Sequence, residues 1–396
     1  MFMDDKRIKK FAGGWHGKRV NVSVPFSDEA VNFLEDLSEE IRNDPETAAV
    51  EDFAAFGFWC RKKQLEAWKK EYRDRNQRLG WGLILHIAPS NIPALSAYSM
   101  ALGLLAGNGN LIRVSRWTEK EAAPLYQVIE RVMSRPEHQK LYEENLIFTC
   151  SHEKEITKAC SDQCDGRIVW GGDDSVREIG KIPMRPGCPV LEFPDRYSIG
   201  IFDSRWMGNR KEEERNELAQ RFYNDTYHVD QNACSSPKML FWLGNEEAGI
   251  EAWWEAVSAA AEKYQLDSWK VSRKYEEICF DIMEKEEIRE IRRKNNRLYV
   301  ADLQECRQKL DTYDGRFGTF YQYKAGSLEE IMPWIGRKVQ TIVCAGIDPE
   351  EIRNEIIRTG VRGGDRIVQV GQALTMGPVW DGKDMIRNLS RQMTAM

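Results

Sequence analysis

The chain has little of what marks proteins that bind nucleic acids or span membranes. It has no excess of positive charge, because 57 Lys and Arg residues face 63 Asp and Glu residues and leave a net charge of −6. No overall field would therefore attract a nucleic acid or an anionic membrane, and a phosphate-bearing ligand would need a local basic site. The longest nearly uncharged apolar run, residues 92–107, is shorter than the roughly 20 residues that a membrane span requires.

The sequence also lacks the features of an exported or metal-binding protein. Residues 4–7 are charged where a signal peptide would need an apolar segment. The nine cysteines are odd in number and irregularly spaced, which is typical of a reducing compartment rather than of a disulfide framework. Cys160 and Cys164 with His152 are weak metal-ligand candidates, because a C-x3-C pair without a second pair is not a usual zinc pattern. We therefore expect a cytoplasmic protein without a metal.

Hydrophobic periodicity predicts an α/β protein with two domains. Residues 27–43 and 54–75 have the spacing of helices, and from residue 82 short apolar runs alternate with helical stretches. This alternation is typical of a doubly wound parallel sheet, which binds ligands at the carboxyl ends of its strands. After Pro194 the composition changes and a second α/β pattern begins, in which we expect residues 284–294 to be helical. The length of 396 residues also favours two domains, since single cores rarely exceed about 250 to 300 residues.

Two strand-to-helix turns in the first half carry residues suited to a functional site. In the turn A-P-S-N-I-P, Asn91 stands where a helix N-cap is expected, with Pro93 in the first helical turn. The alternative is that the Asn91 amide donates a hydrogen bond to a developing oxyanion. In the turn W-G-G-D-D-S, Gly171 and Gly172 would let the backbone approach an anion or a cofactor, although the pattern is not G-x-G-x-x-G.

Cys234 is the candidate nucleophile of the second half. It lies in N-D-T-Y-H-V-D-Q-N-A-C-S-S-P-K-M-L-F-W, after a polar run and just before an apolar run that we expect to be a strand. A thiolate on such a turn is exposed to substrate and can be held by backbone amides. The alternative is that Cys234 packs as a small apolar residue. His228 is a possible assisting base, although a histidine in such a polar run is more often solvated.

Several long motifs in a fixed order resemble the LuxC-type acyl-CoA reductases, within the aldehyde dehydrogenase superfamily. The similarity extends from F-G-F-W-C-R-K-K near Phe56 to W-D-G-K-D-M-I-R-N-L-S-R at the end of the chain. Its sharpest parts are H-I-A-P-S-N-I-P, L-L-A-G-N-G-N-L-I-R-V, W-G-G-D-D, D-Q-N-A-C-S-S-P and G-D-R-I-V-Q-V-G-Q-A-L. The resemblance implies an aldehyde dehydrogenase fold, with N-terminal helices and an NADP-binding domain over 1–193 and a catalytic cysteine domain over 194–371. Residues 372–396 would return to the cofactor domain or to an oligomer interface.

The same resemblance implies covalent chemistry at Cys234. The P-S-N-I-P segment matches the P-W-N-F-P of aldehyde dehydrogenases with Ser90 in place of tryptophan, so that Asn91 becomes the oxyanion donor. The Cys234 thiolate would attack an acyl thioester, the outgoing thiol would leave, and hydride from a reduced nicotinamide would release the aldehyde. No water is activated in this direction. Glu192 replaces the superfamily's general base in V-L-E-F-P, but because Phe193 and Pro194 replace the following glycines we expect it to line the site without being an essential base.

The expected cofactor is NADPH. In aldehyde dehydrogenases a lysine and a glutamate three residues later contact the adenosine ribose, and these positions match Arg113 and Arg116. Two guanidinium groups would bind a 2′-phosphate that a carboxylate would repel, unless one of these arginines is a solvated strand end. The expected cofactor-binding residues are Ala88, Pro89, Ser90, Arg113, Ser115, Arg116, Trp170, Gly171 and Gly172.

The sequence therefore predicts NADPH-dependent reduction of an acyl thioester, either acyl-CoA or acyl-protein, to the aldehyde. The resemblance implies a homo-oligomer and an acyl-protein synthetase as a possible partner, with no nucleic acid and no membrane span. One alternative is an NAD(P)-dependent aldehyde dehydrogenase that forms an acid or an acyl-CoA, in which Glu192 would be the base of the acid-forming reaction. Another is a non-catalytic partner subunit of an acyl-protein synthetase.

Overall fold

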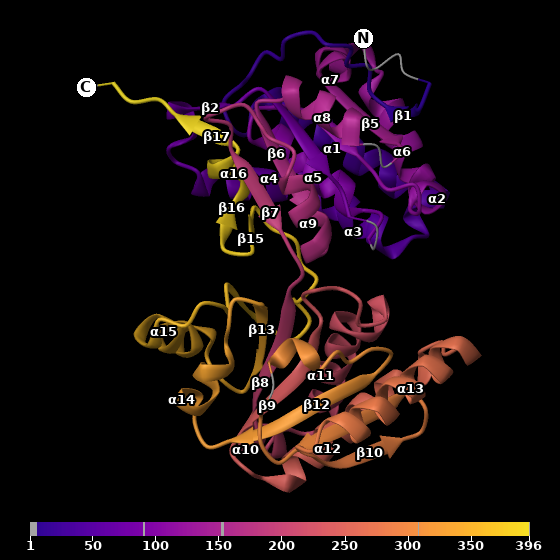
Figure 1. Cartoon of the computed structure of the whole chain (residues 1–396), viewed down its shortest axis with the longest axis vertical. Coiled ribbons are helices and arrows are strands. Elements are labelled where there is room, and N and C mark those ends of the chain that lie inside the picture. Colours follow the sequence, from indigo (N-terminus) through magenta and orange to yellow (C-terminus); the bar gives the residue numbers. More distant parts are fainter. Residues whose placement is uncertain (1–5, 90–91, 152–153, 308, 396) are drawn as a thin grey trace. The chain divides into compact units, whose positions relative to one another are not determined.

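A computed structural model of the chain describes residues 6–89, 92–151, 154–307 and 309–395. The chain forms two compact units (Figure 1). Unit 1 consists of Met1–Pro194 and Met376–Met396, and unit 2 consists of Asp195–Thr375. The chain thus passes between the units at 194/195 and 375/376, where the sequence had suggested 193/194 and 371/372.

Unit 1 is built on a six-stranded sheet with the order β1-β5-β4-β3-β6-β7. Its strands are β1 (Ile8–Ala12), β3 (Leu83–Ile87), β4 (Gly109–Arg113), β5 (Asn145–Cys150), β6 (Gly166–Trp170) and β7 (Val190–Phe193). β1 pairs antiparallel to β5, and the other pairs are parallel. The chain order reverses between β3 and β6, so the carboxyl ends of these two strands form the topological switch point at which such sheets bind ligands.

Helices cover both faces of the unit 1 sheet (Figure 1). The first face packs on α1 (Asp28–Asn43), α3 (Glu51–Trp59), α4 (Lys62–Glu71), α5 (Leu95–Leu105), α6 (Glu119–Met133) and α16 (Met385–Asn388), and the second on α8 (Lys154–Gln163) and α9 (Asp173–Gly180). Strand β3 shows the alternation, because Ile84 packs on the first face and Leu83 and Leu85 on the second. The C-terminal β17 (Ser390–Gln392) pairs with β2 (Arg78–Gly80), so the end of the chain belongs to unit 1. Two-sided burial explains why these strands are continuous apolar runs in the sequence.

Unit 2 contains a seven-stranded sheet with the order β10-β11-β12-β9-β8-β13-β14. Its strands are β8 (Tyr197–Asp203), β9 (Pro237–Leu243), β10 (Ile288–Lys294), β11 (Leu298–Leu303), β12 (Thr319–Ala325), β13 (Val339–Ala345) and β14 (Arg366–Gln369). One face packs on α11 (Glu212–Asp225) and α12 (Glu247–Ala260), and the other on α13 (Ser268–Glu284), α14 (Leu328–Ile331) and α15 (Pro349–Thr359). The prediction of an α/β fold, with a doubly wound sheet in the first domain and a second α/β domain, is therefore confirmed.

The expected helix over residues 284–294 is wrong. α13 ends at Glu284, and β10 is an edge strand that pairs antiparallel to β11. The spacing of Ile288 and Ile291 fits a helix, but the segment forms a strand because it pairs with β11. An ion pair of 2.6 Å between Arg292 and Asp302 stabilises this pairing. A lysine- and arginine-rich edge strand also resists pairing with other chains. Among the described residues, no helix is long and apolar enough to cross a membrane.

Candidate active site

Cys234 differs from most of the other cysteines in its exposure. Six of the nine cysteines are buried, whereas Cys188, Cys234 and Cys279 are half-buried. Burial raises the pKa of Cys160 to about 12 and that of Cys344 to about 11, so these thiols stay protonated at neutral pH. A nucleophilic thiol must be accessible and able to ionise, which restricts the choice to the half-buried three.

The turn that carries Cys234 lies at the amino end of β9, between β8 and β12. The Ser198 hydroxyl, near the start of β8, donates a hydrogen bond of 2.7 Å to the Cys234 carbonyl oxygen. The same hydroxyl oxygen accepts a hydrogen bond of 3.3 Å from the backbone N–H of Thr341 on β13. The backbone of the cysteine is therefore held by the neighbouring strands of the sheet.

Two residues with positive φ angles precede the cysteine. Asp230 has a φ of 54° and Gln231 a φ of 56°, in the left-handed region that side chains other than glycine adopt at a cost. The buried Gln231 side chain compensates, because its Oε1 accepts from the backbone N–H of Gly318 at 2.7 Å and its Nε2 donates to the Thr319 carbonyl at 3.2 Å. Asp230 accepts a hydrogen bond of 2.8 Å from Lys270. Residues 225–236, which we call the cysteine segment, are thus bonded to the amino ends of β8 and β12, and they lead into β9.

The other predicted catalytic residues are placed less fully. His228 lies half-buried in a 3-10 turn, Tyr227–Val229, between α11 and the cysteine, and its role as an assisting base stays a prediction. Asn91 and Ser90 lie outside the described residues. The connection that contains them runs from the end of β3 at Ile87 to the start of α5 at Leu95.

A chain of buried hydrogen bonds joins the strand before this connection to the helix after it. Trp170 Nε1, at the end of β6, donates to the Ser99 hydroxyl on α5 at 3.0 Å, and Ser99 lies 2.7 Å from Nδ1 of His86 on β3. His86 Nε2 lies 2.9 Å from Oδ1 of Asn110, whose amide donates to Asn145. Because Asn110 Oδ1 can only accept, we assign the proton to Nε2, so that Nδ1 accepts from Ser99. Burial lowers the pKa of His86 to about 4, which keeps the imidazole neutral.

The residues expected to contact the adenosine ribose differ in accessibility. The Arg113 side chain is buried and donates a hydrogen bond of 2.8 Å to Thr157 on α8. Arg116 is exposed on the loop after β4, where Ser115 Oγ accepts from the backbone N–H of Trp117 at 3.2 Å. Ala88 is buried and donates its backbone N–H to the Arg113 carbonyl, and Pro89 beside it is half-buried. The accessible positive charge on this loop is therefore that of Arg116.

The glycine turn after β6 is half-buried, and part of its backbone is already bonded, because Gly171 donates its N–H to the Phe193 carbonyl at 3.2 Å and the Gly172 carbonyl accepts from Val176 at 2.9 Å. The Trp170 ring is buried and stacks on Phe193 with ring centroids 3.9 Å apart, so any contribution of this residue to cofactor binding would come from its backbone. Gly171 and Gly172 follow, and α9 begins with two carboxylates, at Asp173 and Asp174. These carboxylates disfavour a phosphate on the axis of α9. A dinucleotide bound at the carboxyl ends of these strands would need the charge of its phosphate met by a residue such as Arg116 rather than by the start of α9.

Glu192 lies in the middle of β7 and is half-buried. Its Oε1 lies 3.6 Å from the position that a Cβ would take on Gly180, so the side chain points toward the end of α9. Its carbonyl oxygen accepts a hydrogen bond from Lys383, whose ammonium group lies 4.7 Å from the centroid of the Phe193 ring. The role of Glu192 as a lining residue rather than an essential base stays a prediction.

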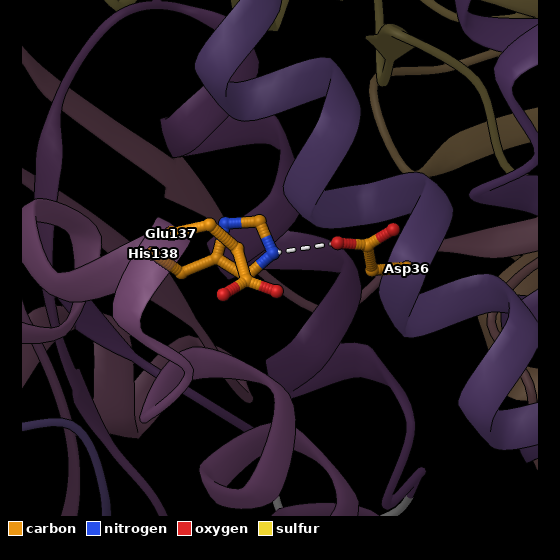
Figure 2. A group of neighbouring side chains, drawn as sticks. All are labelled: Asp36, Glu137 and His138. Atoms are coloured by element: carbon orange, nitrogen blue, oxygen red, sulfur yellow. Dashed lines mark hydrogen bonds and ion pairs between the residues drawn. The ribbon is translucent and has the colours of Figure 1, made fainter.

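One further group of potential metal ligands lies in unit 1, formed by Asp36, Glu137 and His138 (Figure 2). Their ligand atoms lie within 4.8 Å of one another. His138 Nε2 is already 2.7 Å from Asp36 Oδ2, and its buried ring lies edge-on to Phe33 at 5.3 Å between centroids. His138 also precedes α7 (Gln139–Glu144) and the amino end of β5, whereas ligands are expected at the carboxyl ends of the strands. We interpret the group as a hydrogen-bonded contact between α1 and the segment before α7.

A sequence model described as "Acyl-CoA reductase (LuxC)" matches residues 9–311. The chain belongs to the LuxC family of acyl-CoA reductases. It is therefore an oxidoreductase that acts on acyl and aldehyde groups, reducing the acyl group to the aldehyde, and its family and fold imply a nicotinamide cofactor, NAD or NADP. No curated protein matches the sequence.

Solved structures similar to this LuxC-family chain include aldehyde dehydrogenases, which shows the fold. An NAD-dependent aldehyde dehydrogenase from Sinorhizobium meliloti is 12% identical with a TM-score of 0.65, over 92% of this chain and 80% of that one. Aldehyde dehydrogenase 21 from Physcomitrella patens, in complex with the reaction product succinate, is 12% identical with a TM-score of 0.62, over 92% and 84%. Lactaldehyde dehydrogenase from Escherichia coli is 13% identical with a TM-score of 0.59, over 86% and 78%.

The structure of this LuxC-family member adds residues that sequence reasoning missed. His86 and Ser99 lie beside the predicted oxyanion turn, and Ser198 and Gln231 hold the cysteine segment. The signal for two of them was present, because His86 opens the motif H-I-A-P-S-N-I-P and Gln231 lies in D-Q-N-A-C-S-S-P. Ser198 has no such signal, since its partner Cys234 is 36 residues away in the sequence.

Proposed function

We propose that this chain reduces an acyl thioester to the aldehyde with NADPH, through an acyl group carried on Cys234. The observation that supports this most is the placement of the thiol, half-exposed on a turn whose backbone is bonded to β8 and, through Gln231, to β12. The buried cysteines cannot do this chemistry, because their thiols are inaccessible and burial raises the pKa of those such as Cys160.

The residues of the chain have separate tasks in the proposed reaction. The Cys234 thiolate attacks the carbonyl carbon of the thioester and forms a new C–S bond. The C–S bond to the donor then breaks, and the donor leaves as a thiolate that takes up a proton. The side chain of Asn91, as the family resemblance implies, and a backbone amide near Cys234 stabilise the negative oxygen. A bound reduced nicotinamide supplies a hydride. Cys234 then leaves as the thiolate when the aldehyde forms, so that the enzyme returns to its starting state without an activated water.

The preference for NADPH is proposed from the loop after β4. Arg116 is exposed there, where a guanidinium group can form charge-assisted hydrogen bonds to a 2′-phosphate. Ala88, Pro89, Ser90, Ser115, Gly171 and Gly172 would contribute backbone or small side chains around the dinucleotide. Arg113 is buried against α8, so we propose that its part is to hold the carboxyl end of β4.

The acyl donor is proposed to be acyl-CoA or an acyl-protein thioester delivered by an acyl-protein synthetase. Both donors present the same thioester carbon to Cys234, so the chemistry is the same. A homo-oligomer is proposed in line with the family resemblance.

Turnover of variants tests this function. The full-length protein is incubated with NADPH and acyl-CoAs of short, medium and long chain, and aldehyde formation is measured together with NADPH consumption. We expect Cys234→Ala to lose at least about a thousandfold in kcat, as enzymes do that lose their nucleophile. Cys279→Ala is the matched control, since Cys279 is equally half-buried but lies on α13. Equal activity of the two variants would rule out the acyl-cysteine.

A further inference from the structure

Asp225, the last residue of α11, has a buried carboxylate that accepts hydrogen bonds from a distant part of unit 2. It is 1% exposed. Its Oδ2 accepts from the backbone N–H of Gly371 at 2.6 Å, and its Oδ1 accepts from the backbone N–H of Ala373 at 2.9 Å. Both donors belong to residues 370–375, the segment after β14 through which the chain passes to unit 1. One side chain therefore holds two amides of this segment, those of Gly371 and Ala373.

The carbonyl groups of the same segment are held by a single arginine. The Arg366 guanidinium group donates hydrogen bonds of 2.7 Å to the carbonyls of Gln372, Ala373 and Thr375. The segment also packs closely on α11, because Gly371 has a φ of +93° and a Cβ there would lie 2.8 Å from the Cβ of Arg221. These contacts give a structural reason for the motif G-D-R-I-V-Q-V-G-Q-A-L, which the chemistry at Cys234 does not use.

Asp225 is at the same time the first point at which the cysteine segment is fixed. The Ser236 hydroxyl, two residues after Cys234, donates a hydrogen bond of 2.7 Å to the Asp225 carbonyl oxygen. The carbonyl oxygen of the next residue, Thr226, accepts a hydrogen bond of 2.9 Å from the backbone N–H of Gln231. Residues 225–236 thus form a closed loop whose base is the backbone of Asp225, while the Asp225 side chain holds residues 370–375.

We infer that Asp225 is a positioning residue for Cys234, which sets the cysteine segment and the segment 370–375 in one fixed arrangement. The inference rests on the proposed function, in which Cys234 carries the acyl group. A carboxylate is needed because two amide donors approach two different oxygens. Asparagine offers one oxygen and would turn its own NH₂ group toward the second donor. Displacing a catalytic group by about 1 Å is enough to slow a reaction about a hundredfold, so a loosened base of this loop would act on the chemistry.

The test compares Asp225→Asn with Asp203→Asn in the full-length protein. Asp203 is also a residue of unit 2 whose carboxylate accepts a hydrogen bond from a backbone N–H, that of Trp206 at 2.6 Å. It lies at the carboxyl end of β8, whereas Cys234 lies at the amino end of β9. Two rates are measured, the acylation of Cys234 by acyl-CoA without cofactor and the alkylation of Cys234 by iodoacetamide. Both are followed by intact and peptide mass, at a temperature below the melting temperatures of both variants. Alkylation is measured at about pH 9, above the usual thiol pKa, so that it reports access.

We expect Asp225→Asn to slow acylation at least tenfold and to speed alkylation about fivefold, because the thiol is displaced and more exposed. Asp203→Asn should change both rates by less than twofold. Equal behaviour of the two variants would overturn the inference. If the unaltered protein takes up no acyl group from acyl-CoA or from an acyl-protein thioester, the proposed function fails, and the alkylation rates still decide whether Asp225 positions the thiol. If Asp225→Asn does not fold, Ser236→Ala, which removes the bond to the Asp225 carbonyl, must show the same opposite changes, and unchanged rates would again overturn the inference.

Discussion

The Ser99 hydroxyl lies 2.7 Å from His86 Nδ1, and this bond joins the middle of α5 directly to β3 near its end. The connection between β3 and α5 contains Asn91 in the sequence, and this buried hydrogen bond joins the strand before it to the helix after it. The bond continues to Trp170 at the glycine turn after β6 and, on the other side of His86, to Asn110 on β4. The chain therefore links β3, β4 and β6, the three strands whose carboxyl ends are proposed to bind the cofactor, and it meets β4 at its amino end.

This chain predicts how stability depends on pH. Burial lowers the pKa of His86 from 6.5 to about 4, so the unfolded chain binds a proton below pH 6.5 that the folded protein does not. The stability contributed by the neutral imidazole is complete above pH 6.5 and is lost as the pH falls toward 4. The difference in pKa corresponds to about 3 kcal/mol. We expect the free energy of unfolding, measured by urea titration at several pH values, to fall over this range.

The His86→Gln variant is the control for this effect, because other groups also titrate between pH 4 and 6.5. It should be less stable at pH 7 and should lose stability less steeply on acidification. The difference between the two pH curves isolates His86. Parallel curves would mean that His86 keeps an ordinary pKa in the folded protein.

Gly103→Ala should disrupt the same chain from the helix side. A Cβ on Gly103 would lie 1.9 Å from Asn110 Oδ1 and 3.2 Å from His86 Cε1, so the buried asparagine must move. We expect a loss of stability of about 1 to 3 kcal/mol or more, as for overpacked cores, despite the better helix propensity of alanine. Gly336→Ala is the matched control, since a Cβ there meets nothing within 4 Å. Thermal unfolding of the two variants checks this, and equal melting temperatures would contradict it.

Arg116→Glu should change the cofactor preference. The substitution replaces the proposed partner of the 2′-phosphate by a carboxylate that repels it, and the loss of a charged hydrogen bond corresponds to about a tenfold to a hundredfold effect. We expect the ratio of kcat/KM for NADPH to that for NADH to fall by this factor. Lys120→Glu makes the same change of sign at an exposed residue in the first turn of α6. If Lys120→Glu changes the ratio as much as Arg116→Glu does, the effect is a general one of charge.

Glu192→Gln should leave thioester reduction within about threefold of the unaltered rate. No water is activated in this direction, so no general base is needed. The same variant should lose any oxidation of aldehyde to acid if Glu192 is the base of that reaction. A loss of reduction by more than about a hundredfold, with unchanged stability, would show that Glu192 takes part in the reductive chemistry.

The sequence predicted the parts of the fold that depend on local pattern. The strands of unit 1 are buried on both faces, so that β3 and β4 are apolar runs that can be recognised without a structure. The helix expected over residues 284–294 was wrong because two isoleucines three residues apart fit a helix equally well. Only pairing with β11 decides that segment, and pairing is a property of the folded chain.

The candidate site was predictable where a residue acts by its own chemistry and not where it acts through a distant partner. Cys234 was proposed from the polar run before it, the strand after it and the family resemblance, and its role stays a prediction. Asp225 was not proposed, because its partners Gly371 and Ala373 are 146 and 148 residues away in the sequence. The contact of Arg113 with the cofactor stays a prediction, and the sequence did not indicate the hydrogen bond from its guanidinium group to Thr157, on a helix that the pattern does not place beside it.

Acylation of Cys234 in the absence of cofactor tests the central claim most directly. The protein is incubated with acyl-CoAs of several chain lengths without NADPH, and its intact mass is measured beside that of Cys234→Ala. The proposed mechanism predicts a mass increase equal to one acyl group, located on Cys234 by peptide mapping, lost on addition of NADPH and absent from the variant. An acyl-protein donor is tested in the same way. Two results would contradict the proposed mechanism. One is reduction of the thioester at full rate by Cys234→Ala, and the other is turnover of a donor that leaves no acyl adduct on Cys234 when NADPH is omitted.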